Sequence, residues 1–183
     1  MCYNFGMFGP MLVIIVRLIA PLAILRWPFW GMLAAIAADA SDVMIFSKLG
    51  WGILEGRGIY HEFDKIFDIY YLALAAYMAL KWQDVPARRL AIVLFGWRLI
   101  GDVVFEITRV RQVLFFAPNI FENFYLIIAG LLQFFPRFAL SKKRIAAILV
   151  IAAIPKIVQE YVMHYLEFST WQFFKTYFFF WLY

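Results

Sequence analysis

Two pairs of aspartates with helical spacing are the residues of this chain best suited to chemistry. Asp39 and Asp42 are three apart, and Asp64 and Asp68 are four apart, each pair beside an apolar run. Residues at these spacings share one face of a helix, and ionised carboxylates in a bilayer usually mark a function. Clustered carboxylates repel unless a proton or cation joins them. Because hard divalent ions prefer oxygen ligands, the four aspartates predict a metal site for Mg²⁺ or Mn²⁺.

The composition predicts that lipid surrounds this chain. Of its 183 residues, 66% are hydrophobic and 21% aromatic, and long apolar runs are broken only by short basic segments. Such a composition is typical of a multi-pass integral membrane protein, which we place in an inner or plasma membrane. We expect membrane lipids as its surroundings and no nucleic-acid partner.

The elements that must position the aspartates are predicted to be helices. A membrane-spanning helix needs about 20 residues, and without ten-residue alternation of apolar and polar residues a barrel is not credible. We therefore predict an all-α fold: one transmembrane domain over residues 1–183, built as a six-helix bundle, with Pro21 and Pro155 as kinks. The predicted spans are roughly 11–26, 29–47, 62–81, 89–107, 119–136 and 145–167. The aromatic tail 171–183 is too short to span and is predicted to lie along the membrane surface.

Four of the predicted spans carry a polar stripe in the same half of the membrane, which favours a hydrated, charged cavity. Buried ion pairs are the alternative for the stripes outside the aspartate pairs, for example Arg98 with Asp102 or Lys156 with Glu160. Within the two aspartate pairs, Lys65 is the only cation.

The order of these features resembles the CDP-alcohol phosphatidyltransferases. Their signature reads D-x-x-D-G-x-x-A-R, a spacer, and then G-x-x-x-D-x-x-x-D across the second and third of six spans. This chain has Asp39-Ala-Ser-Asp42 and Asp64-Lys-Ile-Phe-Asp68 in the corresponding places, and Arg17-Leu-Ile-Ala-Pro21-Leu is similar to the family's first-helix R-L-x-x-x-P-L. The similarity of the segment beginning Gly96-Trp-Arg to the fourth-helix G-R-E is loose.

The resemblance implies a membrane transferase of phospholipid biosynthesis. It would move a phosphatidyl or similar group from a CDP-linked lipid donor to an alcohol acceptor and release CMP, with Asp39, Asp42 and Asp64 as metal ligands. Asp68 would bind metal or take the proton from the alcohol. Val43 replaces the motif glycine, and Phe46 and Ser47 replace Ala-Arg. Lys48 or Arg57 would then supply the cation for the nucleotide phosphates.

Two other functions stay open. His61, Glu62, Glu106, Glu122, Glu160 and His164 would form a second carboxylate and imidazole site that binds a redox metal or relays protons. Alternatively, the chain is a catalytically inactive accessory subunit that binds lipid or pigment in a membrane protein complex, with its aromatic tail against a partner. A homodimer and a larger complex are both compatible with the sequence.

Overall fold

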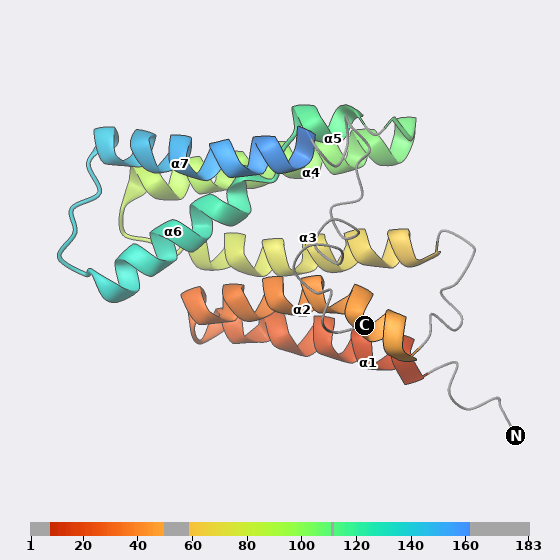
Figure 1. Cartoon of the computed structure of the whole chain (residues 1–183). Helices are drawn as coiled ribbons and strands as arrows, with labels where there is room; N and C mark the ends of the chain where they lie inside the picture. Colours follow the sequence, from red (N-terminus) through yellow and green to blue (C-terminus); the bar gives the residue numbers. More distant parts are fainter. Residues whose placement is uncertain (1–7, 50–58, 111, 162–183) are drawn as a thin grey trace, which may run out of the picture. The chain divides into compact units, whose positions relative to one another are not determined.

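Every regular element in the described part of this protein is a helix, which confirms the all-α prediction. The computed structural model describes residues 8–49, 59–110 and 112–161 (Figure 1). The elements of these described residues are seven α-helices and one 3₁₀-helix, which is labelled η1. In chain order they are α1 (Phe8–Ile19), η1 (Ala20–Leu25), α2 (Pro28–Leu49), α3 (Ile59–Ala79), α4 (Val85–Thr108), α5 (Gln112–Phe116), α6 (Ile120–Phe134) and α7 (Lys142–Glu160).

The described part of each of the six predicted spans is mostly helical, but six membrane crossings are not confirmed. By length and composition, two segments of the described chain can cross a membrane. Phe8–Leu25 consists of α1 and η1, and Gln112–Phe134 contains α5 and α6. A buried core helix or a signal sequence would meet the same criterion. The aromatic tail 171–183 lies outside the described residues.

Two helices, α4 and α7, begin after a residue whose side chain caps an unpaired backbone N–H group. Asp84 precedes α4 and accepts a 2.8 Å hydrogen bond from the backbone N–H of Ala87. Ser141 precedes α7, and its hydroxyl accepts from the N–H of Arg144 at 3.4 Å. Pro28 is the first residue of α2, where its missing N–H costs nothing.

The chain divides into two compact units. Unit 1 consists of Met1–Ile92 and Tyr125–Leu140, and unit 2 of Val93–Phe124 and Ser141–Tyr183. In unit 1, α1, η1, α2 and α3 pack together (Figure 1). Gly31 lets the backbone of α2 come close to that of η1, because a Cβ at this position would overlap the backbone of Ile24 in η1. A side chain at position 31 would therefore push α2 away from η1.

Pro21 changes the type of helix in the first predicted span. The α-helix ends at Ile19, and Ala20–Leu25 continues as a 3₁₀-helix. A proline inside an α-helix removes one backbone hydrogen bond and clashes with the preceding turn, and the tighter 3₁₀ turn accommodates it. The carbonyl of Leu18, just before this change, accepts a hydrogen bond of 3.1 Å from the hydroxyl of Tyr70 on α3. Pro155, in contrast, lies within the continuous helix α7.

Aromatic contacts attach the segment Tyr125–Leu140 to the rest of unit 1. The rings of Trp82 and Tyr125 stack with centroids 5.5 Å apart. Phe29 on α2 meets Phe134 edge to face at 5.1 Å. Such aromatic pairs add to the energy gained by burying the rings.

In unit 2, the second half of α4 packs against α5 and the segment after it. The indole N–H of Trp97 donates to the carbonyl of Phe116 at 3.1 Å, and the ring centroids of Phe95 and Phe121 are 5.5 Å apart. A Cβ added at Gly101 would overlap the side chain of Ala117, so this glycine permits close contact between the two segments.

Exposed apolar side chains follow one face of several helices. On α4 they recur at intervals of three and four residues, the spacing of a single helix face. These residues are Val93, Trp97, Ile100, Val104 and Ile107. The same spacing occurs on α1 and η1, and α7 exposes Val150, Ile151, Ile154, Ile157 and Val158. Extended apolar surfaces of this kind mark contact with a membrane or a protein partner.

Candidate functional site

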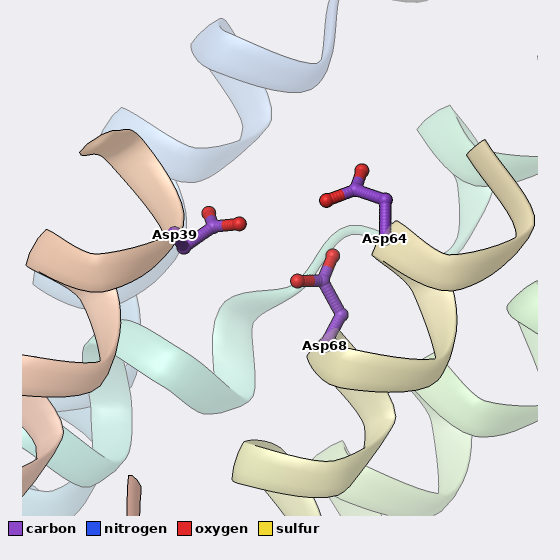
Figure 2. A group of neighbouring side chains, drawn as sticks. All are labelled: Asp39, Asp64 and Asp68. Carbon is purple, nitrogen blue, oxygen red and sulfur yellow. The ribbon is translucent and has the colours of Figure 1, made fainter. Parts of the chain in front are cut away.

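The four aspartates predicted to act together lie together. Figure 2 shows Asp39 on α2 facing Asp64 and Asp68 on α3. One carboxylate oxygen from each of these three residues lies within 4.8 Å of the others. Asp42, one helical turn beyond Asp39, is fully buried and contacts the same cation, Arg17, as the other three. We call Arg17, Asp39, Asp42, Asp64 and Asp68 the aspartate cluster.

Arg17 on α1 is the centre of the aspartate cluster. Its Nη1 lies 2.7 Å from Oδ2 of Asp42 and also contacts Oδ1 of Asp64. Its Nη2 lies 2.6 Å from Oδ1 of Asp39 and 2.7 Å from Oδ1 of Asp68. These are short charge-assisted contacts, and they join three helices through one side chain.

Packing fixes the guanidinium of Arg17 in this position. The side chain is 3% exposed, and its Cζ lies 5.4 Å from the centroid of the Phe67 ring, within the range of a cation–π contact. Phe67 lies on α3 between the two aspartates of that helix. Arginine stays protonated in proteins, so the cluster always contains this one positive charge.

The aspartate cluster has more negative than positive charge. Four carboxylates and one guanidinium give a formal charge of −3 when all are ionised. Asp39 is 40% exposed, and Asp64 and Asp68 are each 32% exposed, so these three carboxylates are partly accessible to solvent. A net negative, partly open group of carboxylates can attract a further cation.

The side chains of the two residues predicted to bind nucleotide phosphates lie outside the described part of the chain. Lys48 is in the last turn of α2, but its side chain lies outside the described part, and Arg57 lies in the undescribed segment 50–58. Their assignment stays a prediction. The side chains of Val43, Phe46 and Ser47, which depart from the family signature, are also outside the described residues.

Unit 2 contains a second set of buried charges, and its described residues form two ion pairs of opposite charge there. Arg98 and Asp102 on α4 form the predicted ion pair at 3.1 Å. Lys156 on α7 contacts Oε1 of Glu122 at 3.4 Å, whereas the sequence suggested Glu160, whose side chain is not described. Oε2 of Glu122 accepts a hydrogen bond of 2.9 Å from Asn119. We call the ion pair of Glu122 on α6 with Lys156 on α7 the α6–α7 pair, and Asn119 is its hydrogen-bond partner.

Two candidates for the alternative site of carboxylates and imidazoles, Glu106 and Glu122, each contact a cation outside that set. Glu122 belongs to the α6–α7 pair, and Glu106 forms an exposed ion pair with Arg109. The side chains of the remaining candidates are outside the described part of the chain, namely His61, Glu62, Glu160 and His164.

Sequence reasoning missed the role of Arg17 and the contact of Lys156 with Glu122. Arg17 stands alone in an apolar stretch of twelve residues that forms α1, and a buried cation of this kind requires an anionic partner. That requirement was a usable signal, because the aspartate pairs have too few cations of their own. The contact between Lys156 and Glu122 spans 34 residues, and no local spacing indicates it.

Comparison of the chain with protein-family models, with curated proteins and with solved structures found no match to any of them. The geometry of the aspartate cluster and the sequence pattern are therefore the basis for a functional assignment.

Proposed function

We propose that this protein is a membrane phosphotransferase similar to the CDP-alcohol phosphatidyltransferases. It would transfer a phosphatidyl or related group from a CDP-linked lipid to an alcohol, and it would depend on Mg²⁺ or Mn²⁺. The observation that carries the proposal is the meeting of Asp39, Asp64 and Asp68 from two helices within 4.8 Å. These residues are three of the four that the resemblance assigns to metal binding; the fourth, Asp42, contacts Arg17 beside them.

The residues present fit a divalent cation in chemistry and in charge. Mg²⁺ takes oxygen ligands at 2.0–2.1 Å in octahedral geometry, which puts neighbouring ligand oxygens about 3 Å apart and opposite ones about 4 Å apart. The three carboxylate oxygens lie within 4.8 Å of one another, so one cation between them could contact all three residues. When bound, such an ion would neutralise charge on the phosphate being transferred.

The chain's own residues then have distinct tasks. Asp68, partly exposed on α3, would accept the proton of the alcohol hydroxyl while the alcohol oxygen bonds to phosphorus. The bond between phosphorus and the CMP oxygen breaks, and CMP leaves with that electron pair. Arg17 holds Asp68 and Asp39 in place through its Nη2 and is a positioning residue. Lys48 or Arg57 would bind the donor's phosphates.

A multi-pass arrangement in a membrane is part of this proposal. It is supported by the two segments able to cross a bilayer and by the exposed apolar faces of α4 and α7. The other helices carry charged side chains within their lengths, and several of these charges are buried in ion pairs. Paired charges facing the interior of a bundle are tolerated in membrane helices.

The direct test is release of CMP from CDP-diacylglycerol by the full-length protein in lipid. Candidate alcohols are supplied with Mg²⁺ or Mn²⁺ and, in parallel, with EDTA. We expect turnover that requires metal and is lost in Asp64→Asn and Asp68→Asn. Asp84→Asn is the matched control, because asparagine caps a helix as well as aspartate does. The same activity in all three variants would contradict the proposal.

A second candidate function is that of an accessory subunit without catalysis. It is favoured by the contacts of Arg17 with all four carboxylates, since such contacts also serve to hold three helices together. In that case a folded preparation would bind no cytidine nucleotide and release no CMP, and the protein would co-purify with a membrane partner in fixed proportion.

A further inference from the structure

Each terminal nitrogen of Arg17 bridges the two helices that carry the aspartates. Nη2 contacts Asp39 on α2 and Asp68 on α3. Nη1 contacts Asp42 on α2 and Asp64 on α3. The planar guanidinium therefore occupies the position of a cation that cross-links carboxylates of neighbouring helices.

The same carboxylates are the ones grouped closely enough to hold a metal ion. Asp39, Asp64 and Asp68 contribute oxygens within 4.8 Å of one another, and Arg17 contacts one oxygen of each. A divalent ion bound by these residues would be only a few ångströms from the guanidinium. At that separation two positive charges repel, and burial of the Arg17 side chain limits how well water screens the repulsion.

We propose that Arg17 is a built-in counter-cation that competes with the divalent cation for the carboxylates of the aspartate cluster. Without metal, the guanidinium holds α1, α2 and α3 together and limits repulsion among the four carboxylates. Metal binding requires Arg17 to give up part of its contacts, so the residue sets the metal concentration at which the site fills. This inference rests on the proposed function for the metal site, and it assigns to Arg17 the control of its affinity.

The test is a titration of the full-length protein in detergent with Mn²⁺, followed by the electron paramagnetic resonance signal of the free ion. Arg17→Gln removes the charge and keeps a polar side chain. We expect it to bind Mn²⁺ at least about tenfold more tightly than the wild type. Arg17→Lys keeps the charge but lacks the fork that reaches four carboxylates, and its affinity should lie between the two.

Arg26→Gln is the matched control, because Arg26 is an exposed arginine of unit 1 at the end of η1. It makes the same change of charge outside the aspartate cluster and should leave Mn²⁺ affinity within about twofold of wild type. If Arg17→Gln does not fold without metal, it is prepared in Mn²⁺ and exchanged during the titration, and Arg17→Lys supplies the same comparison with a milder change.

Thermal unfolding gives a second readout of the competition. In EDTA, Arg17→Gln should unfold at a clearly lower temperature than the wild type, and Mn²⁺ should recover more stability in the variant than in the wild type. This difference follows because only the variant lacks its internal cation.

Equal or weaker Mn²⁺ binding by Arg17→Gln and Arg17→Lys would overturn the inference, as would the absence of binding in all of these proteins. The failure of the proposed function is a separate result. Tighter binding by Arg17→Gln without CMP release from any donor would refute the transferase and leave the competition intact. Metal-dependent CMP release, together with the same Mn²⁺ affinity in the Arg17 variants as in the wild type, would refute the competition and leave the transferase intact.

Discussion

The aspartate cluster of unit 1 and the α6–α7 pair of unit 2 both place charges inside helical packing, but they differ in charge balance. In the first, one guanidinium contacts four carboxylates. In the second, the described contacts of Glu122 include one cation, Lys156, at one carboxylate oxygen and the amide of Asn119 at the other. A carboxylate beside one cation is largely neutralised, whereas several carboxylates packed together repel one another and favour the binding of cations or protons.

The two regions also differ in exposure. The side chains of Glu122 and Lys156 are 12% and 10% exposed, while three aspartates of the cluster are about a third or more exposed. A closed, neutral pair suits a structural role in unit 2. An open, negatively charged cluster suits binding of a cation and of the substrate that the cation would accompany.

Among substitutions in the two regions, the largest effect is expected on turnover, from a change in the aspartate cluster. Asp68→Asn should lower CMP release by roughly 10²–10⁴-fold, because a positioned general base contributes about that much. Its stability should change little. A radiolabelled CDP-diacylglycerol assay, with circular dichroism to verify folding, measures both quantities. Turnover within threefold of wild type would remove Asp68 from the chemistry.

Disruption of the α6–α7 pair should affect stability. Lys156→Met leaves Glu122 buried without its cation and should cost about 3–5 kcal/mol of the free energy of unfolding. Adding Glu122→Gln should restore much of this loss, since the buried charge is then gone. Denaturant unfolding in detergent compares the single and double variants. A double variant as unstable as Lys156→Met would argue against a simple matched pair.

Removal of one carboxylate from the aspartate cluster should have a smaller effect of a different kind. Asp39→Asn lessens repulsion in a group that has excess negative charge, and Asp39 is 40% exposed. In EDTA the free energy of unfolding should therefore stay within about 1 kcal/mol of wild type. A loss of unfolding free energy as large as that caused by Lys156→Met, measured under the same conditions, would mean that Asp39 is needed to balance a cation, as Glu122 is in the α6–α7 pair.

The smallest effects are expected at the cap of α4. Asp84→Asn should be almost neutral, and Asp84→Ala should cost about 1 kcal/mol, because only alanine loses the hydrogen bond to the N–H of Ala87. The two variants calibrate the unfolding assay for the larger changes. Equal losses in both would show that the charge of Asp84, rather than its cap, is what contributes.

The local parts of the fold were predictable from the sequence, and the long-range contacts were not. Apolar runs and breakers such as Pro28 indicate where helices begin, and the three- and four-residue spacings place each aspartate pair on one helix face. The insertion of Arg17 between the pairs depends on how α1 packs against α2 and α3. The contact of Lys156 with Glu122 likewise depends on tertiary packing, which spacing within one helix does not encode.

Binding of Mn²⁺ to the aspartate cluster tests the central claim most directly. The titration compares the wild type with a variant that combines Asp39→Asn, Asp64→Asn and Asp68→Asn, and with Asp84→Asn. We predict saturable binding in the wild type and in Asp84→Asn, and its loss in the triple variant. Undiminished binding by a folded triple variant, or no binding by the folded wild type, would contradict the account.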